Sequence, residues 1–132
     1  QLLDGGISDS IPLKYLESVG YDRNVVILTQ PMGYEKKKNK ALPLMKAAYS
    51  QYPDLLKTMA RRQDVYNETT AYIREKERRG EVFVIRPEAA LKIKRVEHDR
   101  AKIQAVYDQG RAVARKRLPA LREFLQKEGK AT

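Results

Sequence analysis

The sequence predicts an α/β fold in which two or three strands of a mostly parallel sheet are covered by helices. Residues 25–28 and 82–85 are uninterrupted apolar runs rich in Val and Ile, which is the pattern of strands buried on both faces. Around these runs, apolar residues recur at helical spacing. Helices and strands that alternate along a chain are typical of a layered α/β arrangement.

The composition is that of one folded domain. The chain has 132 residues, of which 42% are hydrophobic and 33% are charged. The absence of cysteine excludes disulfides and thiolate metal sites, and it favours a reducing compartment such as the cytoplasm. No apolar run reaches the roughly 18–20 residues that cross a bilayer.

The predicted elements run from a turn at the start of the chain to helices at its end. In chain order they are a turn at 4–6, a helix over 11–19, a strand over 24–29, a basic loop over 34–42, helices over 43–51 and 54–79, a strand over 82–85, and helices over 99–109 and 111–127. The chain begins with Gln1 and meets a turn at once. We therefore expect residues 1–132 to be the C-terminal portion of one larger domain, with a sheet-containing part (1–86) and a C-terminal helical region (87–132).

Most of these boundaries follow from capping and helix-breaking residues. Ser and Asp favour N-caps, Gly ends helices, and Pro removes a backbone donor. The residues used in this way are Ser10, Gly20, Asp54, Gly80, Asp99, Gly110 and Pro119. We expect Gly110 to separate the last two helices, Pro119 to kink or restart the second of them, and Ile103, Val106 and Tyr107 to face inward.

Asp4 is the strongest candidate for chemistry. It follows two leucines that read as the end of a strand, and Gly5 and Gly6 follow it. A carboxylate in that position would lie at the carboxyl edge of the sheet, where α/β proteins bind ligands. The glycines would permit a sharp turn with positive φ and leave the carboxylate open to a partner.

Three segments of the chain, at residues 3–13, 20–22 and 25–31, resemble those of bacterial patatin-like phospholipases. Shorter matches occur at 66–67, 84–87 and 95–97. The resemblance implies a patatin-like α/β/α layered fold and a lipid-degrading esterase that cleaves acyl esters with a serine–aspartate dyad and no cofactor. Asp4 would be the dyad aspartate, and Gly5 and Gly6 would complete its motif.

The nucleophile that the resemblance requires is not in this sequence. The family's serine lies in a Gly-x-Ser-x-Gly elbow, and no serine here has glycines at both flanking positions. A serine hydroxyl attacks only when a base takes its proton, and an oxyanion hole must then stabilise the charge that develops. The resemblance therefore implies that this chain supplies the base to an upstream segment and is inactive alone.

Other polar residues have simpler interpretations. His98 is best read as a solvated neighbour of a helix start, Ser10 as an N-cap and Ser8 as a turn residue, although either serine could in principle be a nucleophile. Scattered carboxylates without clustered His or carboxylate spacing predict no metal site. They are Asp9, Asp22, Glu97 and Asp99.

The net charge of +10 favours contact with polyanions. Lys36, Lys37, Lys38 and Lys40 concentrate this charge in one loop, which is either solvated surface, a contact for anionic lipid headgroups, or a nucleic-acid contact without a recognisable motif. Two alternatives to the hydrolase therefore stay open: a non-catalytic basic domain that binds membranes or nucleic acid, and a structural segment that completes a partner's sheet. An open sheet edge would also permit self-association.

Overall fold

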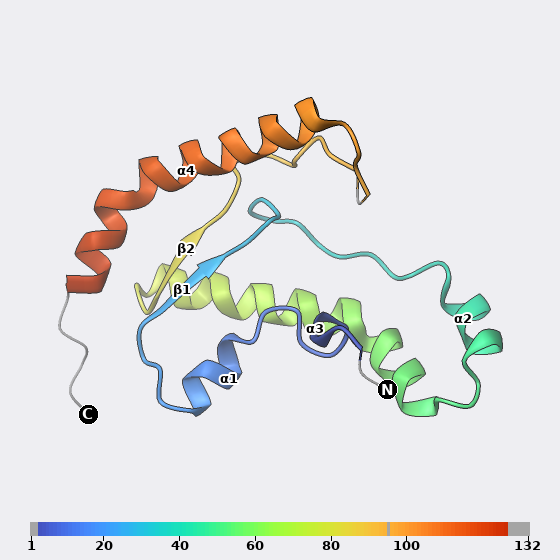
Figure 1. Cartoon of the computed structure of the whole chain (residues 1–132). Coiled ribbons are helices and arrows are strands. Elements are labelled where there is room, and N and C mark those ends of the chain that lie inside the picture. Colours follow the sequence, from blue (N-terminus) through green and yellow to red (C-terminus); the bar gives the residue numbers. More distant parts are fainter. Residues whose placement is uncertain (1–2, 95, 127–132) are drawn as a thin grey trace.

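The computed structural model describes residues 3–94 and 96–126. Its elements are the short 3-10 turn η1 (Gly5–Ile7), α1 (Leu13–Ser18), β1 (Asn24–Ile27), α2 (Leu42–Ala48), α3 (Pro53–Arg78), β2 (Val82–Ile85) and α4 (Arg100–Gln126). Helices and two strands thus form a mixed α/β structure, as predicted (Figure 1). Residues 1–2 of the expected leading strand lie outside the described residues, and Leu3 is exposed and not in a strand.

The two strands pair in parallel. The register runs from Asn24 opposite Val82 to Ile27 opposite Ile85, and the Leu28 amide adds a further hydrogen bond to the Ile85 carbonyl at 2.8 Å. Parallel neighbours need a long crossover, which α3 provides. The parallel pairing and the bounds of β2 confirm the prediction, and β1 ends two residues before the expected limit.

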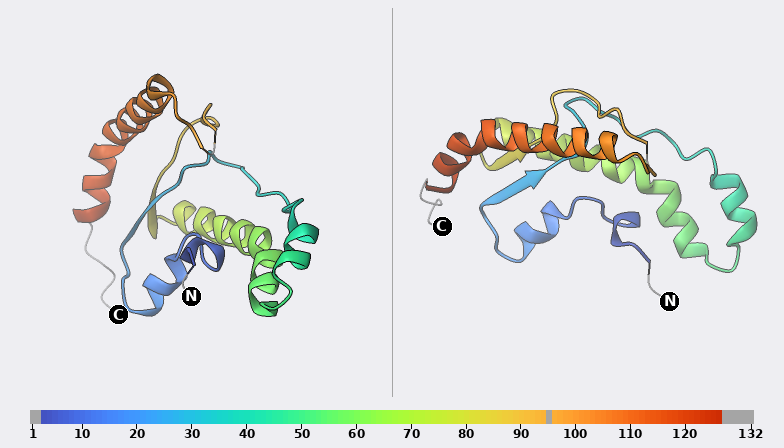
Figure 2. Two further views of the ribbon diagram at one scale, coloured as in Figure 1. Left: turned by 45° about the vertical axis from the view of Figure 1, so that its right-hand side comes forward. Right: turned by 45° about the horizontal axis from the view of Figure 1, so that its top comes forward.

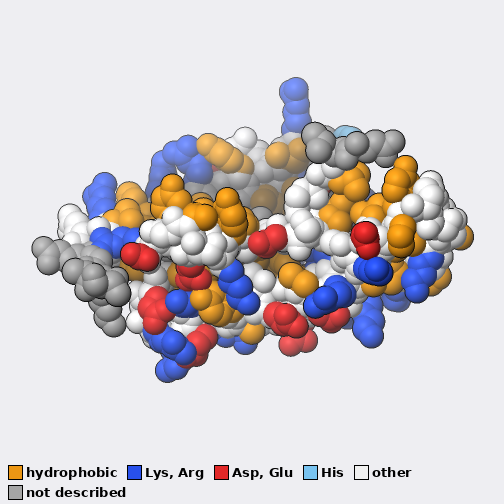
Figure 3. Space-filling view, turned by 90° about the horizontal axis from the view of Figure 1, so that it is seen from below, with side chains coloured by type: hydrophobic (Ala, Val, Ile, Leu, Met, Phe, Trp, Pro, Cys, Tyr) orange, Lys and Arg blue, Asp and Glu red, His pale blue; other side chains and the backbone are white. Residues whose placement is uncertain are grey.

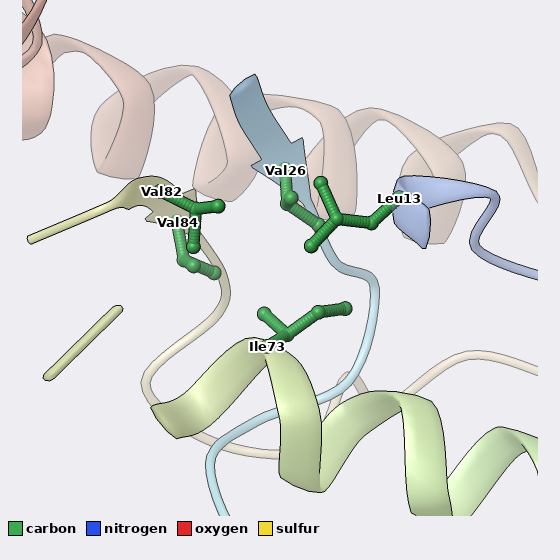
Figure 4. Close-up of a cluster of buried hydrophobic side chains, with 5 residues drawn as sticks. All are labelled: Leu13, Val26, Ile73, Val82 and Val84. Atoms are coloured by element: carbon green, nitrogen blue, oxygen red, sulfur yellow. The ribbon is translucent and has the colours of Figure 1, made fainter. Parts of the chain in front are cut away.

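The core lies between the sheet and α3. Ile73 of α3 has no exposed surface, and it clusters with the buried Leu13, Val26, Val82 and Val84 (Figure 4). Helix α4 covers the other face of β2. There the rings of Phe83 and Phe124 lie 5.7 Å apart. One small apolar cluster therefore joins α1, α3 and both strands.

The prediction that both strands are buried on both faces is correct for β2 and wrong for β1. Val25 is 38% exposed and Ile27 is 74% exposed. The register places these residues beside Phe83 and Ile85, on the side of the sheet that α4 occupies. Since α4 packs on β2, this side of β1 stays open (Figure 2).

The glycine and aspartate signals at several helix ends are confirmed. Gly20 and Gly80 follow α1 and α3 with φ of 91° and 73°, a conformation that other residues rarely adopt. Asp99 caps α4, because its Oδ1 accepts from the amides of Ala101 (2.9 Å) and Lys102 (3.3 Å).

Two expected caps are wrong. Ser10 donates its hydroxyl to the Gly6 carbonyl at 2.8 Å, and α1 begins only after Pro12. Asp54 lies inside the first turn of α3 and pairs with Lys57. In both places the helix begins at or beside a proline, whose fixed φ suits a first turn without any side-chain cap.

The expected break at Gly110 is also wrong. α4 is continuous from Arg100 to Gln126, with Pro119 inside it. A glycine costs a helix only about 1 kcal/mol, and Ala, Leu, Arg and Lys dominate the rest of this segment. Val106 is half-buried, whereas Ile103 and Tyr107 are exposed rather than inward. No helix within the described residues combines the length and apolar character needed to cross a membrane.

Candidate functional site

Asp4 begins the short turn η1 and holds it with its own carboxylate. Its Oδ1 accepts a hydrogen bond from the Gly6 amide at 2.8 Å, and its carbonyl accepts from the Ile7 amide at 3.0 Å. The residue is exposed, so the carboxylate is anchored through one oxygen at the protein surface. The second oxygen, Oδ2, is thereby presented to another donor.

The glycines of this turn serve a purpose that differs from the expected one. Neither Gly5 nor Gly6 has a positive φ. At Gly6, a Cβ atom would lie 3.3 Å from the Asp4 Oδ1, closer than ordinary contact. Gly6 therefore leaves room for the carboxylate to fold over the turn, whereas a Cβ at Gly5 would meet nothing within 4 Å.

Arg62 is a site residue that the sequence reasoning missed. Its Nε donates to the Gly6 carbonyl at 3.0 Å, so α3 fixes the Asp4 turn from 56 residues away. Ser10 donates to the same carbonyl. The sequence carries no local signal for this contact, because Arg62 lies in an ordinary run of helical residues.

Ser8 and His98, the other polar residues considered from the sequence, make only local contacts. Ser8 donates to the Gly5 carbonyl at 3.0 Å, which confirms its interpretation as a turn residue. His98 is exposed, and Glu97 accepts from its backbone amide. Within residues 3–94 and 96–126, no group of three or more His, Asp or Glu side chains is placed to hold a metal ion.

A cluster of charged side chains holds α1 against α3, just after the Asp4 turn. Tyr72 donates to Glu17 Oε2 at 2.7 Å, and Lys76 bridges Glu17 (3.3 Å) and Glu81 (2.7 Å). The hydrogen bond to Glu17 raises the pKa of Tyr72, and the contact with Glu81 raises the pKa of Lys76. This cluster fixes the segment that follows the turn.

The lysine loop lies against the middle of α3. Asn67 clamps it with two hydrogen bonds, accepting from the Lys36 amide (2.8 Å) and donating to the Lys36 carbonyl (3.1 Å). The Lys36 ammonium lies 4.7 Å from the centre of the Tyr66 ring, and Tyr66 meets Tyr34 edge-on. Burial and the neighbouring Tyr34 raise the pKa of Tyr66.

Lys37, Lys38 and Lys40 extend from this clamped loop and are exposed. Lys38 and Lys40 line a surface hollow of about 440 Å³ whose opposite wall includes Gln63 and Asp64 of α3. The structure thus gathers the predicted lysines in one place. Asp4 begins η1, whereas the lysines lie on the loop before α2, so the two candidate sites come from different segments of the chain.

These features define a class of protein: an α/β unit with a parallel strand pair between two long helices and an exposed carboxylate on a preceding turn. The chain belongs to the family described as Domain of unknown function (DUF6363), whose model matches residues 52–126. No curated protein and no solved structure matches the chain. The matched segment spans α3, β2 and α4, and so includes Arg62 and Asn67 but not Asp4.

Proposed function

We propose that this chain supplies the aspartate base of a patatin-like lipid acyl hydrolase that acts in the cytoplasm at the membrane surface. The observation that carries the proposal is the Asp4 carboxylate, which is exposed yet fixed by the Gly6 amide at 2.8 Å. The resemblance of residues 3–31 to bacterial patatin-like phospholipases supports the same role. The substrate would be a lipid or another acyl ester.

In this mechanism the serine comes from a segment outside the present sequence. Its hydroxyl proton passes to Asp4 Oδ2 as its oxygen attacks the ester carbonyl, and the proton then passes to the departing alcohol. The hydrogen bond from the Gly6 amide to Oδ1 fixes the orientation of the carboxylate. Water then cleaves the acyl-serine by the same route, with Asp4 again as the base.

Arg62 is a positioning residue in this proposal. It does not touch the carboxylate, but it holds the carbonyl of Gly6, the residue whose amide binds Asp4. A shift of about 1 Å in a catalytic group can cost on the order of 100-fold in rate. The contact therefore links α3, within the matched family segment, to the position of the base.

The first test replaces the base. In protein that carries the serine, Asp4→Asn should lower kcat by about 10²–10⁴-fold, because an amide keeps the shape but cannot take the proton. Asp22→Asn, at another exposed aspartate, is the matched control and should keep full turnover. The assay is hydrolysis of a short-chain nitrophenyl ester, with circular dichroism to verify folding.

Two outcomes would contradict the proposal. Near-normal turnover of Asp4→Asn would return Asp4 to the role of a turn residue. Hydrolysis by residues 1–132 alone, above an Asp4→Ala control, would show that the nucleophile lies within this sequence. The net charge of +10 favours the alternative of a non-catalytic basic domain. Near-normal turnover of Asp4→Asn would support that alternative.

A further inference from the structure

Residues 34–52, here named the lysine corner, concentrate positive charge. The segment contains five lysines, at positions 36, 37, 38, 40 and 46, and one acidic residue, Glu35, which gives a net charge of +4. Among the described residues, Lys37, Lys38 and Lys40 take part in no ion pair. Their charges are therefore available to an external partner.

The same corner exposes apolar side chains. Leu44 of α2 is 74% exposed, Tyr49 is 45% exposed and Tyr52 is 42% exposed. Met45, on the same short helix, is half-buried, as is Leu42. Helix α2 thus has one side that packs on α3 and another that presents a leucine to solvent.

The corner projects from the molecule. In Figures 1 and 2 the loop and α2 lie at the opposite end of the structure from the C-terminal end of α4. In Figure 3, hydrophobic side chains at the α2 end lie beside lysines and arginines. A flat surface can therefore approach the corner without meeting the sheet.

The loop is also held in place before any partner arrives. The two hydrogen bonds of Asn67 and the contact of the Lys36 ammonium with the Tyr66 ring already fix the loop near its start. Ordering a loop on binding costs free energy, so a loop that is already ordered binds more tightly. The anchored Lys36 therefore fixes the start of the segment from which the exposed Lys37, Lys38 and Lys40 extend.

We propose that the lysine corner docks on an anionic lipid bilayer, with Lys37, Lys38 and Lys40 over the headgroups and Leu44 inserted among the acyl chains. Lysine ammonium groups attract anionic lipids without a required geometry, and leucine gains free energy only where it leaves water. Nucleic acid offers no such environment for Leu44. This inference rests on the proposed function and deepens it, because the bilayer would contain the ester substrate of the hydrolase.

The test is co-sedimentation of the chain with vesicles of phosphatidylglycerol and phosphatidylcholine, compared with phosphatidylcholine alone. The triple variant Lys37→Gln, Lys38→Gln, Lys40→Gln should lose on the order of 100-fold in partition at low salt, and added salt should mask the difference. Leu44→Gln should lose about tenfold or more, and this loss should persist in salt. The matched control, Lys57→Gln, Lys92→Gln, Lys94→Gln, changes the net charge equally and should bind nearly as wild type.

Several results would overturn the docking surface. One such result is equal vesicle binding by wild type and by the variant with Lys37, Lys38 and Lys40 replaced. Another is an equal loss of binding in the control variant, which would show that only the net charge of the chain matters. Tighter binding to single-stranded RNA than to vesicles, unaffected by Leu44→Gln, would identify a nucleic-acid site instead. Asp4→Asn should bind vesicles as wild type, so failed catalysis with intact binding would reject the proposed function and leave the docking surface standing.

Discussion

Glu75 shows how local pairing sets the ionisation of a single residue. Its carboxylate accepts from Arg78 at 2.8 and 3.0 Å and from Arg79 at 2.8 Å, all at the exposed end of α3. These hydrogen bonds, that of Arg78 first, lower the pKa of Glu75 from 4.5 to about 2. Cationic side chains in the last turn of a helix also complement its dipole, and Arg78 lies there.

The lowered pKa predicts a direction for stability against pH. The pKa of Glu75 is lower in the folded chain than its ordinary value of 4.5. Its ionised carboxylate therefore contributes fully to the free energy of unfolding above pH 4.5, and this contribution is lost as the pH falls toward 2. Glu75→Gln should therefore reduce the acid dependence of stability between these limits. Carboxyl chemical shifts followed by NMR should titrate with a midpoint near pH 2, and a midpoint near 4.5 would show that the arginines do not hold Glu75 in solution.

At the scale of one element, Gly110 weakens α4 without interrupting it, although the sequence predicted a break at this residue. Gly110 lies in the middle of the helix, and a Cβ added there would meet nothing within 4 Å. Gly80 offers the same free space but has φ of 73°, where a Cβ is strained. Space for a Cβ therefore does not distinguish the two glycines, whereas their backbone conformation does.

Gly110→Ala should raise the free energy of unfolding by about 0.5–1 kcal/mol, because alanine loses less conformational entropy in a helix. Gly80→Ala should lower it by about 1 kcal/mol or more, since its conformation disfavours any side chain. Urea unfolding followed by circular dichroism measures both changes. A destabilised Gly110→Ala variant would indicate that another segment approaches the helix at this point.

The elements also differ in how far local sequence determines them. The bounds of β2, the ends at Gly20 and Gly80 and the cap at Asp99 follow from signals within a few residues, and these predictions are correct. The continuity of α4 depends on a sum over many residues in which one glycine counts little. The contact from Arg62 to Gly6 joins parts of the chain that are 56 residues apart, so no local pattern encodes it.

At the scale of the whole molecule, the two faces of the sheet are unequal. One face holds Ile73 and its buried neighbours against α3, whereas on the other face β1 leaves Val25 and Ile27 open. Parallel strands are ordinarily covered on both faces. An uncovered apolar strand is a surface on which a further segment or a second copy of the chain would gain contacts.

Two isoleucines distinguish these faces. Ile73→Ala should cost about 2–5 kcal/mol, because it opens a cavity at a fully buried position. Ile27→Ala should cost less than about 0.5 kcal/mol in the isolated chain, since the side chain is 74% exposed. Thermal unfolding of both variants measures the contrast. A large cost for Ile27→Ala at high protein concentration, absent on dilution, would show that copies of the chain cover this face.

The parallel pairing of β1 and β2 has a consequence for the chain as it is made on the ribosome. Asn24 pairs with Val82, which is synthesised 58 residues later. At roughly 5–20 residues per second, β1 waits about 3–12 s for its partner. Through that interval β2 cannot yet pair with its valines and Ile27, because the whole crossover of α3 must emerge first. The yield of folded chain during translation therefore depends on what shields this short apolar strand while it waits.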